Sequence, residues 1–291
     1  MSNKKELKIS NKSDRPDNIV LRDHLLIEKA MEYEKRLPSF MKDYFVYLKS
    51  SVAVSTRAAY LEDIIFFCEY IVNESGLTDK DDMKNLTVED FKNIKSRDVN
   101  LFLGDYCPRY YKEREDHTFV YENNNRALAR KKSSISTLFK FLYRNEQLPT
   151  NITDGFNPIK LPKPQPDAIK RLDIDEVMVM LDAVESGEGL TEKEKVYWEK
   201  TKLRDKAILA LFVTYGLRLN ELRELNISSF NFSRGEFKIY RKRGKEVLMP
   251  INKTCENVVI DYINYERPKS EDLPEDVQDA LFLSLQRKRL T

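Results

Sequence analysis

The sequence has little of what most metal centres and hydrolytic active sites require. It contains two histidines, His24 and His117, and three cysteines that stand far apart at positions 68, 107 and 255. Two isolated histidines argue against a histidine-rich metal centre and a Ser-His-Asp triad, and no GxSxG motif is present. An odd number of scattered cysteines argues against a disulfide framework or a zinc site and is typical of a reducing compartment. We therefore expect no metal site and a cytoplasmic location.

Nucleotide-binding motifs and long apolar runs are also missing. The absence of a GxxxxGKS/T loop and of GxGxxG argues against nucleotide hydrolysis and dinucleotide cofactors, so no cofactor is expected. The central apolar run from Ala207 to Val213 is far too short to span a bilayer. Residues 1–20 are polar and lack the apolar core of a secretion signal. We expect no association with membranes.

Charge is abundant but separated along the chain. The 291 residues carry a formal net charge of only +2, although 34% of them are charged. Basic residues are concentrated in two segments: Arg126, Arg130, Lys131, Lys132, Lys140 and Arg144 in the first, and Lys238, Arg241, Lys242, Arg243 and Lys245 in the second. Separated charge lets a nearly neutral protein present basic faces to a polyanion. The alternative, that these runs are ordinary solvated faces, stays open here.

The length favours two domains, and a proline-rich segment marks the boundary between them. Apolar residues at helical spacing predict helices over 25–36, 37–50, 56–74, 88–103 and 123–145, so the first half is expected to be all-helical. Pro162, Pro164 and Pro166 cannot continue a helix and predict an extended linker. We divide the chain into a leader (1–36), a helical domain (37–156), the linker (157–170) and a second domain (171–291).

Local signals predict where individual elements begin and end. The expected helix caps are Ser55 or Thr56, Thr87 with Asp90, and Asp173 with Glu176. The second domain is expected to contain helices over 174–184, 201–215 and 253–268, a β-hairpin within 230–251, and a short strand at 281–284.

The stretch from Lys206 to Pro250 has the features of a phosphate site. An apolar helix is expected to end in a glycine cap at Gly216, which would fix Arg218 at a packed corner. Glu221 follows one helical turn later and can hold the guanidinium in place. A fixed arginine suits bidentate contact with phosphate oxygens. The alternative is a surface ion pair beside a glycine cap.

Two further basic features point in the same direction. Lys242, in the turn of the expected hairpin, could deliver an ammonium to a reacting phosphodiester as an electrostatic stabiliser or proton donor. Arg126, Arg130 and Lys131, with the asparagines before them, could contact phosphates and base edges in a groove. The alternatives are a solvated hairpin tip and an ordinary amphipathic helix.

Several stretches match a known pattern in the same order. Residues 214–222 read TYGLRLNEL, and residues 230–251 read as strand, basic turn, strand and proline. They resemble the TGLRxSEL box and the strand–KGxK–strand–proline pattern of the tyrosine recombinases, also called the phage integrase family. Residues 40–71 and 127–147 resemble the helices of that family's core-binding, SAM-like domain. The resemblance covers residues 38–291 and implies a mainly α fold: a helical core-binding domain, then an α+β catalytic domain of the DNA breaking-rejoining type with a small β-hairpin or sheet, incomplete at its C-terminus.

The resemblance implies roles for individual residues. Arg218 corresponds to the first catalytic arginine, which grips the scissile phosphate, and Glu221 takes the supporting acidic position. Lys242 corresponds to the hairpin lysine that protonates the leaving 5′ oxygen. The turn departs from KGxK, so Lys245 competes with Lys242 for this role. The expected DNA-binding residues are Arg126, Arg130, Lys131, Lys132, Thr56, Arg57, Arg241, Arg243 and Lys245.

The family cleaves a DNA strand with a tyrosine, forms a 3′-phosphotyrosyl link and rejoins strands as a tetramer. The resemblance therefore implies a site-specific recombinase or integrase that binds duplex DNA and self-associates on it. The family's His-x-x-Arg and nucleophilic tyrosine have no counterpart in these 291 residues, so we expect DNA binding without cleavage by this chain alone. One alternative is a DNA-binding remnant that acts by site occupancy or partner capture. Another is a helical interaction protein without a nucleic-acid role.

Overall fold

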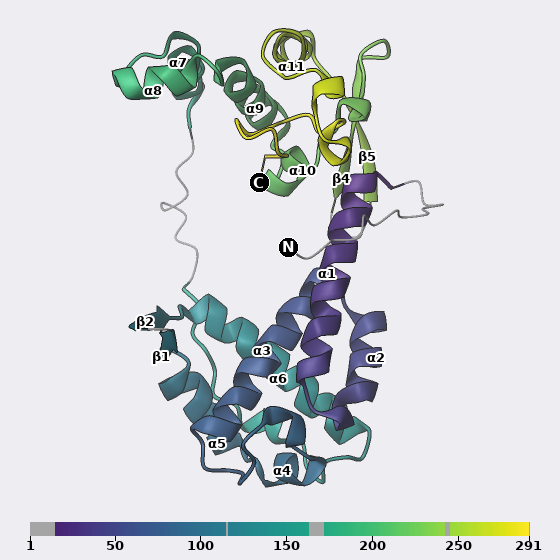
Figure 1. Ribbon diagram of the computed structural model, residues 1–291, viewed down its shortest axis with the longest axis vertical. Coiled ribbons are helices and arrows are strands. Elements are labelled where there is room, and N and C mark those ends of the chain that lie inside the picture. Colours follow the sequence, from purple (N-terminus) through teal and green to yellow (C-terminus); the bar gives the residue numbers. More distant parts are fainter. Residues whose placement is uncertain (1–14, 115, 163–171, 242–244, 291) are drawn as a thin grey trace. The chain divides into compact units, whose positions relative to one another are not determined.

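The computed structural model describes residues 15–114, 116–162, 172–241 and 245–290. The chain divides into two compact units, each described here by itself (Figure 1). The N-terminal unit is Val20–Gln165, and the C-terminal unit is Pro166–Thr291 together with Met1–Ile19. The mainly helical fold class predicted from the sequence is confirmed.

Helices make up most of the N-terminal unit. They are α1 (Asp17–Arg36), α2 (Lys42–Ser51), α3 (Val54–Asn73), α4 (Val88–Asn93), α5 (Ser96–Leu101) and α6 (Asn125–Arg144). In Figure 1 α6 runs beside α3, and these two helices form the main helix pair of the unit. The helix expected over 25–36 begins earlier, at Asp17. The carboxylate of Asp17 lies in the first turn, where its negative charge interacts favourably with the helix dipole and stabilises the helix.

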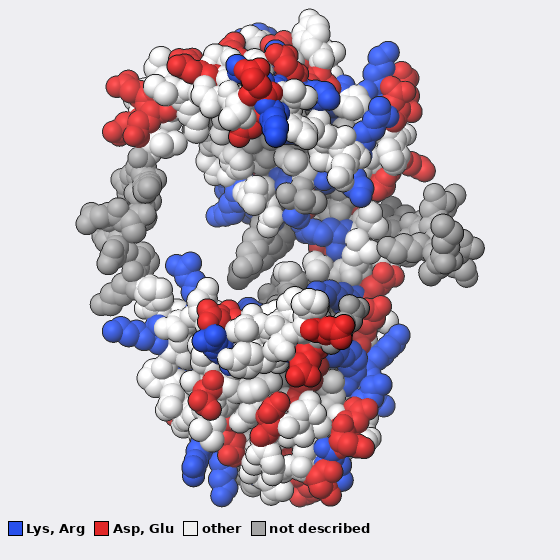
Figure 2. Space-filling view, turned by 60° about the vertical axis from the view of Figure 1, so that its left-hand side comes forward, with Lys and Arg blue, Asp and Glu red and all other residues white. Residues whose placement is uncertain are grey.

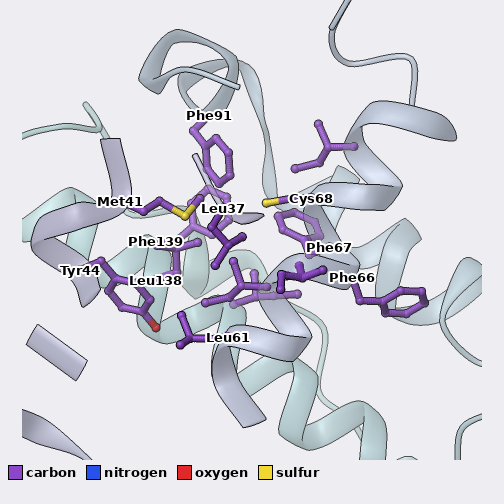
Figure 3. Packing of buried hydrophobic residues seen from close by; sticks show 14 of the residues in the cluster. Leu37, Met41, Tyr44, Leu61, Phe66, Phe67, Cys68, Phe91, Leu138 and Phe139 are labelled. Carbon is purple, nitrogen blue, oxygen red and sulfur yellow. The ribbon is translucent and has the colours of Figure 1, made fainter. Parts of the chain in front are cut away.

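The core of this unit follows the apolar spacing of α3 and α6. Figure 3 shows Leu61 and Phe67 of α3 pointing toward Leu138 and Phe139 of α6, with Met41 filling the space beside them. Leu61, Leu138 and Met41 are fully buried. Burying a large apolar side chain stabilises the fold by about 1.5–3 kcal/mol, so this helix pair holds the unit together.

Two expectations for this unit were wrong. The segment before α6 forms a β-hairpin, with β1 (Arg109–Arg114) antiparallel to β2 (His117–Glu122), so the unit is not all-helical. Its stability comes from aromatic packing that spacing alone did not reveal: Tyr110 stacks on Tyr121 at 5.2 Å between ring centroids and contacts Phe66 at 4.6 Å. The N-cap of α3 is Ala53, not Ser55 or Thr56, because the helix begins two residues earlier than expected.

The C-terminal unit combines helices with a small sheet. Its elements are α7 (Ile174–Ser186), α8 (Glu192–Trp198), α9 (Lys202–Tyr215), α10 (Leu219–Arg223), β3 (Phe230–Asn231), β4 (Glu236–Arg241), β5 (Lys245–Pro250) and α11 (Lys253–Tyr265). The three strands are antiparallel in the order β3-β4-β5. Helix α9 packs against both α11 and α7. Phe237 of the sheet, Leu211 of α9 and Val259 of α11 meet in one buried cluster.

Local signals in this unit had mixed outcomes. The capping box of Asp173 and Glu176 is confirmed, as is that of Thr87 and Asp90 in the other unit. The strand expected at 281–284 is absent from the described residues, where Leu283 makes only an isolated bridge with Arg289. The segment is nevertheless buried, because Phe282 stacks on Tyr262 of α11. Its apolar run reflects burial and not strand pairing. Within the described residues, no helix is long and apolar enough to cross a membrane.

Candidate nucleic-acid interface

A left-handed glycine sets the corner that carries Arg218. Gly216 has φ 58°, and its amide donates to the carbonyl of Phe212 at 2.9 Å, which ends α9 as expected. This conformation favours glycine because a Cβ would be strained there. Leu217 is buried next to it. The chain therefore turns sharply against the core and places Arg218 at the N-cap of α10.

Arg218 is held at one edge and open at the other. Its Nη1 donates to Oε1 of Glu221 at 2.7 Å, and its backbone amide donates to Oε2 of the same carboxylate at 3.0 Å. The Arg218 side chain is 73% exposed, whereas that of Glu221 is 5% exposed. An exposed guanidinium pinned by a buried carboxylate is well suited to bind a phosphate.

The environment of Glu221 keeps its carboxylate charged. Burial acts to raise the pKa of Glu221, but the hydrogen bonds from Arg218 and the charges of Arg218 and Arg241 outweigh it. The pKa of Glu221 therefore lies below its usual value. Glu221 remains an anion at neutral pH and keeps Arg218 in place.

The predicted hairpin brings a second arginine to the same carboxylate. Arg241 pairs with Lys245 in the β4–β5 register, and its Nε lies 3.8 Å from Oε1 of Glu221. Lys245 is exposed beside it. Lys242 and Arg243 lie outside the described residues, so the choice between Lys242 and Lys245 as the hairpin lysine stays a prediction.

The two tyrosines of α11 differ in accessibility. Tyr262 is buried, and its hydroxyl accepts a hydrogen bond from the amide of Leu283 at 3.2 Å. Burial raises the pKa of Tyr262 to about 12. Tyr265 is exposed. Tyr262 is thus part of the core and is not poised as a nucleophile.

The start of α6 forms an open basic pocket in the N-terminal unit. Asn124 caps the helix, accepting from the amide of Ala127 at 3.0 Å. A pocket of about 500 Å³ is lined by Asn124, Asn125, Arg126, Lys160 and Pro162. Arg126 is exposed, and the positive end of the helix dipole adds to its charge. Figure 2 shows lysines and arginines on the visible faces of both units, interspersed with acidic residues.

Further along α6, a buried aspartate binds three residues of the helix. Asp63 of α3 is fully buried and accepts from Nη1 of Arg130 at 2.5 Å, Nζ of Lys131 at 3.1 Å and Oγ of Ser134 at 2.7 Å. Lys131 is itself buried and lies over the ring of Phe66. Lys131 therefore does not lie on the outer face where we expected it to contact DNA. Arg130 remains 43% exposed beyond its bond to Asp63.

The other expected DNA-binding residues of this unit differ in exposure. Arg57 is buried, and its Nε and Nη2 both donate to Oε1 of Glu34, so it joins α3 to α1. Thr56 is half-buried at the start of α3. Lys132 donates to the carbonyls of Phe156 and Asn157 and stays partly exposed. Arg126 and Arg130 of α6 are exposed and Lys132 is partly exposed, and Lys140 and Arg144 are exposed nearer the end of the helix.

Sequence reasoning missed Asp63, although a signal was present. This carboxylate stands within the apolar run of 56–74, next to Ile64, where a helix facing the core should carry no unpaired charge. Such an aspartate requires a buried cation, and Lys131 supplies it. In the part of the chain that the structure describes, no cluster of His, Cys, Asp or Glu could hold a metal ion.

Known proteins match this chain over most of its length. The model of the phage integrase family matches residues 170–291. Tyrosine recombinase XerS of Streptococcus thermophilus is 26% identical over 285 residues, covering 91% of this chain and 77% of the relative. Tyrosine recombinase XerC of Syntrophus aciditrophicus is 27% identical over 252 residues, covering 86% and 71%.

Two solved structures have similar folds. The XerH site-specific recombinase bound to difH substrate gives a TM-score of 0.50 at 17% identity, covering 97% of this chain and 71% of that one. A lambda integrase dimer, residues 75–356, bound to a COC′ core site gives 0.51 at 15% identity, covering 87% and 72%. At these identities the likeness concerns the fold.

Proposed function

The chain belongs to the tyrosine recombinase family, and from this premise we propose that it is a site-specific DNA recombinase that binds duplex DNA and serves strand exchange. The observation that carries the proposal is the open guanidinium of Arg218, held by buried Glu221 behind a left-handed Gly216. This corner lies within the segment matched by the family model.

In the proposed reaction Arg218 binds the non-bridging oxygens of the scissile phosphate. A tyrosine hydroxyl, a role that we assign to none of the described tyrosines, loses its proton to solvent as it attacks phosphorus; a 3′-phosphotyrosyl bond forms, and the bond from phosphorus to the 5′ oxygen breaks. The guanidinium stabilises the charge that accumulates on the phosphate in the transition state. Lys242 is proposed to donate a proton to the leaving 5′ oxygen. The phosphotyrosyl bond retains the energy needed for rejoining, so no nucleotide is consumed.

We further propose that the N-terminal unit holds the duplex through the outer face of α6. Arg126, Arg130 and Lys132 are accessible cations in its first half, and the helix N-terminus adds a favourable dipole. In the C-terminal unit, Arg241 and Lys245 would contact the backbone beside Arg218. The predicted boundaries, with a core-binding domain over 37–156 and a catalytic domain over 171–291, stay part of this proposal.

Partners and compartment follow from the same function. The lambda integrase structure, which has a similar fold, is a dimer bound to a core site. This supports self-association of this chain on DNA, and we propose a tetramer as the assembly that exchanges strands. A cytoplasmic location is proposed, since the three cysteines are free and buried. The alternative of a remnant acting by occupancy alone has no support over strand exchange among the matched relatives.

The direct test is binding to random duplex DNA at two salt concentrations, measured by gel shift. The logarithm of the binding constant should fall linearly with the logarithm of salt concentration, by about 0.9 per phosphate contact. Arg218→Ala should weaken binding modestly without unfolding the protein, and should abolish strand cleavage wherever the wild type cleaves. Binding that does not respond to salt, or no binding at all, would refute the proposal.

A further inference from the structure

Two arginines from different elements share one buried carboxylate oxygen. Oε1 of Glu221 lies 2.7 Å from Nη1 of Arg218 and 3.8 Å from Nε of Arg241. Arg218 reaches it from the N-cap of α10, and Arg241 from the end of β4. Both guanidiniums are therefore adjacent, and both have a solvent-facing side, since Arg241 is 42% exposed.

The charges at this point do not cancel. Glu221 supplies one negative charge, and the two guanidiniums supply two positive charges. The hydrogen bonds of Glu221 go to Arg218, whereas 3.8 Å is too long for a hydrogen bond to Arg241. Arg241 is thus attracted to the corner while its donors remain available. A surplus positive charge with open N–H groups is what an anion requires.

The backbone beneath each arginine is fixed. Arg241 closes the described β4–β5 ladder through its pairing with Lys245, so strand pairing holds its Cα. The capping box of α10 holds that of Arg218. Groups placed in advance lose little conformational freedom on binding, which favours tight contact with a small ligand.

We propose that Arg218 and Arg241 together bind a single phosphate of the DNA backbone, with Glu221 as the buried anion that keeps the two guanidiniums side by side. The inference rests on the proposed function and gives Arg241 a defined role. In this arrangement Arg241 contacts the same phosphate as Arg218 and does more than add positive charge to the surface.

The test is a titration of the full chain with inorganic phosphate against chloride at constant ionic strength. The Nε–Hε signals of the arginines are followed by NMR and assigned by their loss in the Arg218→Ala and Arg241→Ala variants. The signals of Arg218 and Arg241 should shift with the same apparent Kd. Arg241→Ala should raise the Kd read at Arg218 about tenfold, equivalent to about 1.4 kcal/mol. Arg241→Lys keeps the positive charge but lacks the planar guanidinium that can make two hydrogen bonds to one phosphate. Its affinity for phosphate should therefore lie between those of Arg241→Ala and the wild type.

Arg234→Ala is the matched control, because it removes another exposed arginine of the same unit, 4.0 Å from Glu236. It should leave the Kd at Arg218 unchanged. An unchanged Kd in Arg241→Ala, equal weakening in Arg234→Ala, or no response of Arg218 to phosphate would each overturn the inference. Salt-sensitive duplex binding in the same preparations tells this failure apart from failure of the proposed function, which would abolish that binding.

Discussion

Asp63 of α3 and Lys131 of α6 form an ion pair inside the N-terminal unit, with Oδ1 and Nζ 3.1 Å apart and both residues buried. The pair joins the two helices that make up most of the core. It also turns Lys131 away from solvent, whereas Arg126 is exposed and Lys132 is partly exposed on the same helix.

Removing Asp63 should destabilise the N-terminal unit strongly. Asp63→Ala leaves the ammonium of Lys131 buried without its partner, which costs about 3–5 kcal/mol. Urea unfolding followed by circular dichroism measures the loss. Asp63→Ala combined with Lys131→Met removes the stranded charge and should recover much of the stability. A double variant as unstable as the single one would show that the pair itself is not the cause.

The left-handed turn at Gly216 should be specific for glycine. Gly216→Ala meets no atom within 4 Å, so its expected cost of about 1 kcal/mol comes from φ alone. Gly104→Ala is the matched control, because that position is equally open and has no positive φ. Thermal unfolding of both variants decides the matter. Equal melting temperatures would contradict the backbone explanation.

The outer face of α6 should account for part of the salt dependence of DNA binding. Arg126→Glu with Lys132→Glu should weaken binding to random duplex and lower the slope against salt by about one for each lost phosphate contact. Lys131 is left intact because a glutamate there would face buried Asp63. Lys42→Glu with Lys84→Glu changes the charge equally at exposed positions on other elements. If both pairs reduce binding alike, α6 is not the contact face.

The contribution of Glu221 to the free energy of unfolding should decrease in acid. Its folded-state pKa lies below the unfolded value, so the carboxylate stabilises the fold above the unfolded pKa. That contribution disappears as the pH falls through the folded pKa. Glu221→Gln lacks it, so the difference in unfolding free energy between wild type and variant should be larger at pH 7 than at pH 3. A difference independent of pH would rule out this charge effect.

The sequence predicted the features that depend on neighbouring residues. Gly216, Arg218 and Glu221 lie within six positions, and glycine caps and capping boxes act over such distances. The apolar spacing likewise predicted a helix over 123–145, and Leu138 and Phe139 lie on its buried face. Both follow from helix geometry alone.

Contacts between distant segments were beyond this reasoning. The sequence predicts Lys131 as a DNA contact, and its burial could not be foreseen because it depends on Asp63, 68 positions away. The burial of Arg57 was unforeseen for the same reason, since its partner Glu34 belongs to another helix. The proximity of Arg241 to Glu221 depends on how β4 packs beside α10. The spacing of charged residues in the sequence does not show whether a given side chain faces solvent or a buried partner.

The hairpin β1–β2 has a consequence for local opening. An isolated two-stranded hairpin is marginally stable in water, and this one is fixed mainly by Tyr110 against Phe66 and Tyr121. Its outer face leaves Tyr111 and Val120 exposed. We therefore expect the amides of Arg109–Arg114 to exchange with solvent through a small opening that leaves α3 and α6 intact, well before the helical core unfolds.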